Sequence, residues 1–251
     1  MARQQYNTSR RRRRRSALGR IVTFLVICLV LFLGVTVFFR VNEIVVDGDT
    51  RYTDREVIEA SGLTIGAHML LIREDAVRSG ILNNLPYAGL VEFRRQFPSR
   101  VTLTVTDAVA VALVHFEDGY LLLDRGAQIL ERVDTRPAEG LILLEGLQTP
   151  ILPRVGQVLA LGEEGRAQLV YLQDILGTFW TLGLTSRVSV LDMQEVHNPQ
   201  FIYGERLTVL LGPHHNLQRK LDMLSGIVAY LDEDERGVID LNPERPVFRA
   251  E

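Results

Sequence analysis

Two adjacent histidines, His214 and His215, are the residues that first suggest metal chemistry. Zinc sites built on two histidines usually place them at i, i+4 or a longer spacing and add a third ligand. Adjacent side chains point apart, and no cysteine or further histidine stands near this pair. The other histidines, His68, His115 and His197, are isolated in the sequence. We therefore expect a solvated loop at 214–215, structural roles for the other three, and neither a metal nor a cofactor.

Carboxylates are abundant, but none stands in a recognisable catalytic pattern. The run at 232–235 reads Asp-Glu-Asp-Glu, without the alternating ligands and glycine of a calcium loop. The chain has no nucleophile elbow, phosphate-binding loop or dinucleotide fingerprint. Glycoside hydrolysis needs a carboxylate pair across a cleft, and the 31 acidic residues single out no such pair. We predict no enzyme and no small-molecule substrate.

The element that must position everything else is Ile21–Phe39, nineteen residues without charge or proline. As a helix it covers roughly 28 Å, close to the ~30 Å hydrocarbon core of a bilayer. Its Leu, Ile, Val and Phe side chains favour insertion by about 5 kcal/mol. The run ends in two phenylalanines and an arginine, unlike a signal-peptide cleavage site, and is long for a buried helix of a soluble core. We predict one uncleaved transmembrane helix.

The charges before this run predict its orientation. Residues 1–20 hold eight arginines, six of them at Arg10–Arg15, and no acidic residue. The positive-inside rule keeps such a segment in the cytoplasm, and anionic lipid adds roughly 1 kcal/mol per charge. Arginine runs also bind nucleic acid, but beside a membrane span no such partner is needed. We expect a single-pass protein of a bacterial cytoplasmic membrane, with lipid and no nucleic acid as a partner.

The rest of the chain is acidic and nearly free of cysteine. Residues 21–251 carry 20 basic and 31 acidic side chains, a net charge of −11, unlike a nucleic-acid binder. Enough chain follows residue 40 for one large or two small domains. The one cysteine, Cys28, lies in the apolar run, so the exported part has no disulfide and must rely on its hydrophobic cores.

Residues 40–110 are predicted to form a first domain with the order strand, helix, helix, strand, strand. Thr53 and Glu56 have the spacing of a capping box, and Gly62 is a helix stop signal. Valine and leucine alternate with threonine over 101–106, which is typical of a half-buried strand. The predicted elements are Val41–Asp47, a helix over 53–62, a helix over 73–84, Gly89–Gln96 and Val101–Thr106.

Residues 111–251 are predicted to form a second, mixed α/β domain with a mostly antiparallel sheet, which makes the chain an α+β protein. A glycine-bearing turn at 124–127 indicates a hairpin. The predicted strands are Gly119–Leu123, Gln128–Val133, Leu141–Leu144, Val188–Met193, Gln200–Tyr203, Arg206–Leu211 and a final strand, Gly237–Leu241. Apolar residues at helical spacing predict helices over 163–181 and 216–231.

Several short segments stand in a set order along both regions: Ile44–Asp49 with Tyr52, Ser61–Leu63 with Gly66, Leu85–Tyr87, Val91–Pro98, Leu211-Gly212, Lys220 and Ile239–Leu241. Their order after a single N-terminal span resembles the FtsQ/DivIB family of bacterial cell-division proteins. The resemblance implies that 40–110 form a POTRA domain and that 111–251 form the family's β domain. The segment Asp107–Ala112 departs from the family's Glu-Arg-x-Pro-Val-Ala motif.

The resemblance also implies a function and a binding site. Family members bind the small protein FtsB/DivIC, paired with FtsL, at their C-terminal strand region, and a strand near a chain end can leave a sheet edge open. We therefore expect a scaffold at the division septum that supports septal peptidoglycan synthesis. The implied partner-binding residues are Gly237, Val238, Ile239, Asp240, Leu241, Val247, Phe248, Arg249 and Lys220.

The sequence leaves alternatives open for Lys220, for the final strand and for the function. Lys220 is either an exposed helix residue or one half of an ion pair beside the final strand, and that strand is either a binding edge or an ordinary last strand. A charge at Ile239 or Phe248 is expected to abolish partner capture without unfolding the protein. The competing functions are a POTRA protein of outer-membrane export and, less favoured, an envelope hydrolase.

Overall fold

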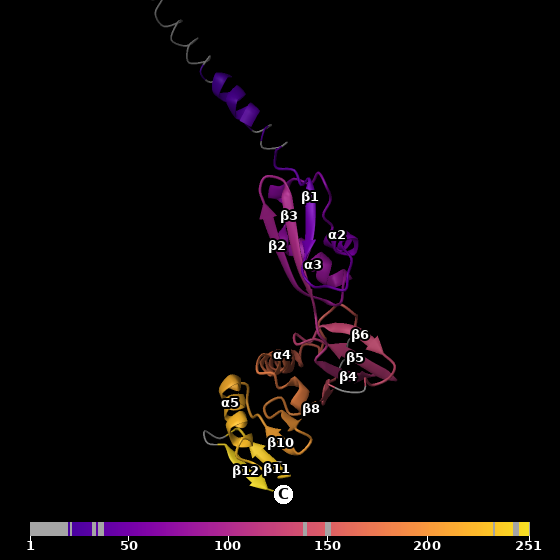
Figure 1. Ribbon diagram of the computed structural model, residues 1–251, viewed down its shortest axis with the longest axis vertical. Coiled ribbons are helices and arrows are strands. Elements are labelled where there is room, and N and C mark those ends of the chain that lie inside the picture. Colours follow the sequence, from indigo (N-terminus) through magenta and orange to yellow (C-terminus); the bar gives the residue numbers. More distant parts are fainter. Residues whose placement is uncertain are drawn as a thin grey trace, which may run out of the picture.

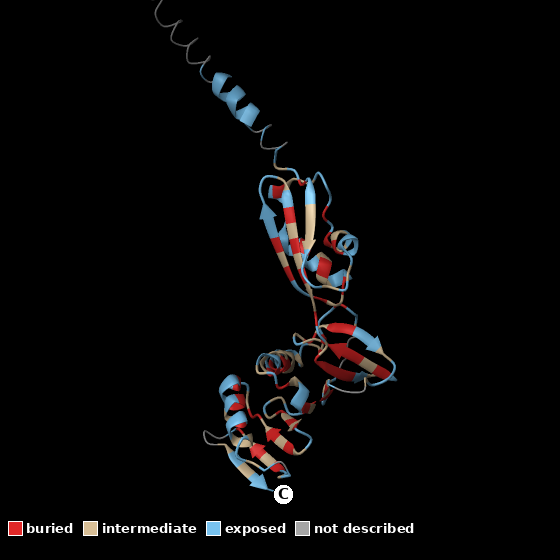
Figure 2. Cartoon of the chain, in the orientation of Figure 1, coloured by how far each residue is buried: buried red, intermediate tan, exposed pale blue. Residues whose placement is uncertain are grey.

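The computed structural model describes residues 20, 22–31, 34, 38–137, 140–148, 152–232, 234–242 and 246–250. Residues 22–31 are helical, and their large apolar side chains are exposed (Figure 2). Among the residues described, no helix is both long enough and apolar enough to cross a membrane. The predicted transmembrane helix includes residues 21, 32, 33 and 35–37, and the predicted basic tail includes 1–19. These residues lie outside the described part of the chain.

The first domain has the predicted order of elements (Figure 1). Its strands are β1 (Glu43–Asp47), β2 (Ala88–Gln96) and β3 (Arg100–Asp107), and its helices are α2 (Asp54–Ser61) and α3 (Glu74–Asn84), with a 3₁₀ turn, η1 (Met69–Leu71), between the helices. The central strand β3 runs parallel to β1 and antiparallel to β2. The predicted strand–helix–helix–strand–strand pattern is confirmed.

The core of this domain lies between its sheet and its helices. Val101, Leu103 and Val105 of β3 are fully buried, as the alternation with threonine predicts. They belong to one hydrophobic cluster with Val57 of α2 and Ile81 of α3. One face of the sheet therefore carries both helices.

The start and stop of α2 follow the predicted local chemistry. The Thr53 hydroxyl accepts from the Glu56 amide at 3.4 Å, and the Glu56 carboxylate accepts from the Thr53 amide at 2.8 Å. This is the predicted capping box. Gly62 ends the helix in the left-handed region, with φ of 68°.

The second domain is a nine-stranded sheet, counted over the described residues, with the strand order β12-β11-β10-β9-β8-β7-β4-β5-β6. The strands are β4 (Ala112–Phe116), β5 (Gly119–Leu123), β6 (Ile129–Val133), β7 (Ile142–Glu145), β8 (Val188–Asp192), β9 (Gln200–Tyr203), β10 (Leu207–Leu210), β11 (Gly237–Asp240) and β12 (Val247–Ala250). Its helices are α4 (Arg166–Thr181) and α5 (Leu217–Val228), and a 3₁₀ turn, η2 (Thr185–Arg187), precedes β8. Antiparallel pairings outnumber parallel ones in this sheet, as predicted.

Two strands lie outside the predicted set. The strand β4 lies between β5 and β7, and its first three residues, Ala112–Val114, are all buried, so its sequence lacks the alternation of a half-buried strand. The strand β12 is short and mostly exposed, and it is defined by its pairing with β11. The prediction that Gly237–Leu241 is the last strand is therefore wrong.

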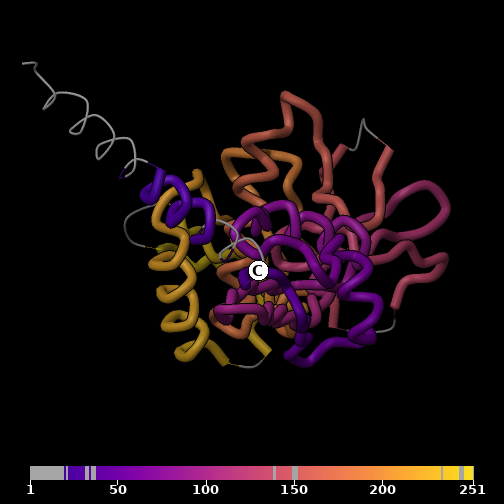
Figure 3. The backbone as a smooth tube through the Cα atoms, turned by 90° about the horizontal axis from the view of Figure 1, so that it is seen from above, coloured from indigo at the N-terminus to yellow at the C-terminus, as the bar shows by residue number. Residues whose placement is uncertain are grey.

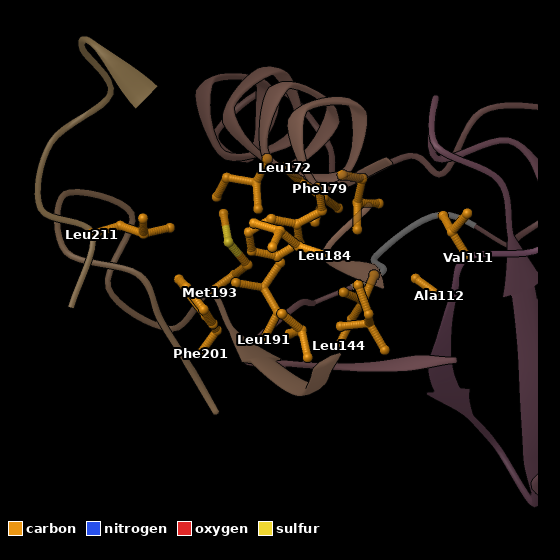
Figure 4. Close-up of a cluster of buried hydrophobic side chains, with 14 of the residues drawn as sticks. Val111, Ala112, Leu144, Leu172, Phe179, Leu184, Leu191, Met193, Phe201 and Leu211 are labelled. Carbon is orange, nitrogen blue, oxygen red and sulfur yellow. The ribbon is translucent and has the colours of Figure 1, made fainter. Parts of the chain in front are cut away.

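The main core fills the space between this sheet and its helices. Figure 4 shows Leu172 and Phe179 of α4 beside Leu191 and Phe201 of the sheet. The rings of Phe179 and Phe201 meet edge to face, with centroids 5.0 Å apart. The apolar stripe of α4 that the helical spacing predicted is thus the face that packs against the strands.

The opposite face of the sheet carries a smaller cluster that joins the two domains. Leu113, Leu122 and Leu130 form this cluster, and Ala108 and Tyr87 pack with them. Figure 1 shows the first domain set end to end with the second, and the view from above in Figure 3 shows it in front of the second domain. The junction is therefore a packed contact in addition to a chain connection.

Candidate partner-binding site

The predicted partner-binding residues of the last segments fall in or beside two neighbouring strands. In the antiparallel pairing of β11 with β12, Val238 lies opposite Arg249, Ile239 opposite Phe248 and Asp240 opposite Val247. On its other side β11 pairs in parallel with β10. The strand expected to form the edge is therefore interior, and β12 forms the edge of the described sheet.

The two strands differ sharply in burial. Ile239 is fully buried and Leu241 nearly so, both within the main core. Val247 is 42 % exposed, while Phe248 is half-buried and packs against that core. Figure 2 shows β12 largely pale blue along its length. A charge at Ile239 would therefore unfold the domain rather than only block a partner, which corrects the expectation for that residue.

Gly237 sets how closely β12 approaches β11. A Cβ added at Gly237 would meet the carbonyl oxygen of Arg249 below any normal contact distance and would lie 2.9 Å from Cε2 of Phe248. Any side chain there would push β12 away from the sheet. Glycine is thus required at this position by the close approach of the edge strand.

Lys220 lies in α5 and has a role that sequence reasoning missed. Its side chain is buried, and Nζ donates to the carbonyl oxygens of Leu211 at 2.7 Å and Pro213 at 2.9 Å. Burial lowers the pKa of Lys220. Backbone carbonyls, and not a carboxylate, therefore accept from Lys220. The expected ion pair and the alternative of an exposed helix residue are both wrong. Only the apolar helix face beside Lys220 hinted at its burial.

Lys220 acts on the turn that follows β10. The same turn is held by the Tyr171 hydroxyl, which donates to the Gly212 carbonyl at 2.9 Å, and by Asn198, whose Oδ1 accepts from the Gly212 amide at 3.1 Å. The Leu241 amide donates to the carbonyl of Leu210 at 2.9 Å, just before the turn. Lys220 therefore positions β10 and β11 and does not lie on the open edge.

The two histidines of the pair lie in different surroundings. His214 stacks on the ring of Tyr171, with centroids 4.4 Å apart, and its Nε2 lies 2.6 Å from Oδ2 of Asp174. His215 is exposed. Within the described residues, no three histidine, cysteine or acidic side chains gather in a way that could hold a metal ion. The predicted loop is correct, although His214 packs on α4 instead of standing free in solvent.

Two surface hollows of the second domain contain no catalytic carboxylate pair. One, of about 580 Å³, is lined by Arg187, Arg206 and Tyr203 with apolar neighbours and by no acidic residue. The other, of about 890 Å³, has Glu205 as its one acidic lining residue. Acid–base hydrolysis of a glycoside needs two carboxyl groups facing one cleft, and neither hollow supplies them.

The junction between the domains carries a polar network. Asp107 pairs with Arg51 at 3.0 Å, and the Arg51 guanidinium lies 3.7 Å from the centroid of the Tyr87 ring. The Tyr87 hydroxyl donates to Glu131 of β6 at 2.7 Å, and Gln128 donates to the Pro86 carbonyl at 3.1 Å. Asp107, the first residue of the segment that departs from the family motif, thus has a charged partner here.

A domain profile described as POTRA domain, FtsQ-type, matches residues 39–107, which contain β1 to β3. The chain therefore contains a POTRA domain of this type. It is 28 % identical over 222 residues to the cell division protein FtsQ of Anaeromyxobacter sp. (strain K), covering 84 % of this chain and 70 % of that protein. It is also 28 % identical over 252 residues to the cell division protein DivIB of Brevibacillus brevis, covering 97 % and 87 %. The domain profile and these relatives together support the FtsQ/DivIB family for this chain.

Proposed function

We propose that this protein is a non-enzymatic scaffold of the cell-division machinery, anchored in the cytoplasmic membrane. In this proposal it holds an FtsB/DivIC-like and FtsL-like pair at the division septum and thereby supports septal peptidoglycan synthesis. Support for the cell-division role comes from the POTRA match and from relatives named as cell division proteins.

The observation that carries the proposal is the open edge of β12. Among the described strands β12 pairs with β11 alone, which leaves the backbone groups on its other side to an added strand in this proposal. Addition of a strand supplies main-chain hydrogen bonds, and the side chains on either face supply specificity. A partner strand would thus extend the sheet beyond Val247–Ala250.

The anchor in this proposal is the apolar run Ile21–Phe39, with the arginine-rich segment before it in the cytoplasm. The helix at 22–31 supports it, because its large apolar side chains are exposed in the described part of the chain and lipid would cover them. The POTRA domain then stands next to the membrane and is available to earlier components of the division machinery. The second domain carries the capture edge farther along the chain.

The test is capture of the purified FtsB/DivIC–FtsL pair from the same bacterium by the full-length protein in detergent. We expect a variant lacking residues 247–251 to lose capture while its circular dichroism spectrum keeps the signal of the remaining sheet. Val247→Asp and Val170→Asp form a matched pair, because both valines are similarly exposed, at 42 % and 47 %. Loss of capture by Val247→Asp alone supports the edge. Unchanged capture by the truncated protein refutes it.

A second measurement addresses location. A fluorescent fusion of the full chain should concentrate at midcell, where a protein of outer-membrane export would be spread over the envelope. An even distribution in dividing cells would contradict the septal role.

A further inference from the structure

Large apolar side chains are exposed together at one end of the POTRA domain. They come from three separate segments: the chain before β1, the loop that joins α2 to α3, and the tip of the β2–β3 hairpin. The exposed fractions are 65 % for Phe38, 74 % for Ile65, 52 % for Leu70, 78 % for Leu71 and 59 % for Phe97. We call these five residues the apolar collar.

Direct contacts hold the three segments side by side. The Met69 amide donates to the Phe39 carbonyl at 2.8 Å, and the Val41 amide and carbonyl bond with the α2–α3 loop, at Ala67 and Gly66, at 2.9 and 2.7 Å. The ring of Phe97 meets the ring of Phe39 edge to face, with centroids 5.7 Å apart. The collar is therefore a surface built around residues 39–41 and not a chance set of loop tips.

The collar has no spacer between it and the apolar run. Phe39 is the last residue of that run, and its own carbonyl is bonded to the loop that carries Leu70 and Leu71. One residue of extended chain spans only about 3.5 Å. Wherever the run leaves the hydrocarbon, the collar must lie at nearly the same depth.

Arginines surround the collar. Arg40 follows the apolar run, and Arg95 donates to the carbonyl of Ile72 at 2.8 Å, directly after Leu71. Arg100 directly follows the tip of the β2–β3 hairpin and pairs with Glu43 at 2.8 Å. All three arginines are exposed. Apolar side chains ringed by cationic groups fit the boundary between acyl chains and phosphate headgroups.

We propose that the apolar collar is seated in the headgroup region of the outer leaflet, with lipid as its occupant. The POTRA domain then rests on the bilayer at a fixed height. This inference rests on the proposed membrane anchor, because the anchor brings the collar to the lipid surface. The collar adds a second, independent contact with lipid, made by the folded domain itself.

The test uses full-length protein in phosphatidylethanolamine–phosphatidylglycerol vesicles with an environment-sensitive dye on single cysteines. Leu71→Cys and Phe97→Cys, each in a Cys28→Ser background, report the collar. Leu90→Cys is the matched control, an exposed leucine near the opposite end of β2, roughly 24 Å from Phe97 by strand rise. The native Cys28 reports the anchor.

We expect a shallow nitroxide lipid to remove most of the fluorescence at 71 and 97, with a blue shift of the emission, and to leave the dye at 90 unaffected. If the dyes at 71 and 97 behave like the dye at 90 while a deep nitroxide lipid quenches Cys28, the anchor stands and the collar inference fails. If Cys28 is not quenched, the anchor itself fails and the collar inference falls with it.

Discussion

Replacing Gly237 with alanine should detach the edge strand while leaving the rest of the sheet in place. The new methyl group would clash with the Arg249 carbonyl and lie 2.9 Å from Cε2 of Phe248. The first of these is backbone, which cannot move aside by a change of rotamer. Relief of the clash therefore requires β12 to leave β11.

The free energy that holds β12 on the sheet follows from its contacts. Half-burial of Phe248 contributes about 1 kcal/mol, since full burial of phenylalanine is worth about 1.5–3 kcal/mol. The four paired positions of β12 hold roughly four backbone hydrogen bonds, which at about 0.5 kcal/mol net each add about 2 kcal/mol. Loss of about 3 kcal/mol corresponds to roughly 100-fold weaker protection of the β12 amides.

Hydrogen exchange followed by mass spectrometry of the C-terminal peptide measures this protection. Gly226→Ala is the matched control, because Gly226 is an exposed helix residue with no atom within 4 Å of an added Cβ. That change should stabilise α5 by roughly 0.5–1 kcal/mol and leave β12 unchanged. If Gly237→Ala keeps native protection at 247–250, the close approach of the two strands does not control the edge and the reasoning is wrong.

Three further substitutions test how Lys220, Thr53 and Tyr171 contribute to stability. Lys220→Met should destabilise the second domain by about 2–4 kcal/mol in urea unfolding, because it leaves the buried Leu211 carbonyl and the half-buried Pro213 carbonyl without their donor; a loss below about 0.5 kcal/mol would contradict this role. Thr53→Ala should cost about 1 kcal/mol by removing the cap of α2, and Thr53→Ser should keep most of it. Burial raises the pKa of Tyr171 to about 12, above its value of ~10 in the unfolded chain. Between these two pH values the folded protein binds more protons than the unfolded chain does. Its stability therefore falls as the pH rises through this interval. Tyr171→Phe should flatten that alkaline fall in thermal melts, and an unchanged slope would refute the assignment.

The alkaline behaviour of Lys220 has the opposite sign. Burial lowers its pKa in the folded state, so on raising the pH the folded protein releases this proton before the unfolded chain does. The unfolded state then binds more protons, and stability rises with pH in the interval below the ordinary value of 10.5. Comparison of Lys220→Met with Tyr171→Phe therefore separates the two contributions to one pH profile.

Local chemistry made much of the first domain predictable. The Thr53–Glu56 box and Gly62 give the two ends of α2, and the Val–Thr alternation of β3 gives its buried face. Each signal acts within a few residues, so the sequence alone contains it. The helix stripe of α4 was predictable for the same reason.

The missed features depend on contacts that are distant in sequence. The strand β4 is buried on both faces because α4 covers one side and the first domain the other, which removes its alternation. The strand β12 needs the backbone of β11, and Lys220 needs carbonyls in a turn that precedes its helix. In each case the contacting segment reaches its position only when the whole sheet has formed. The site was thus predictable as a region, while its edge strand was not.

With the proposed anchor in a membrane, the height of the open edge above the lipid depends on the contacts that join the two domains. The POTRA domain begins directly after the apolar run, and the Tyr87–Glu131 and Gln128–Pro86 bonds fix the second domain on the first. Within the second domain, β12 is joined through β11 and β10 to the turn that Lys220 holds. These contacts among the described residues link the start of the POTRA domain to β12, so a collar seated on the bilayer would set the height of β12 above it. A partner anchored in the same membrane must then present its strand at that height. The length of the partner between its own anchor and its strand would therefore help to decide whether it can bind β12.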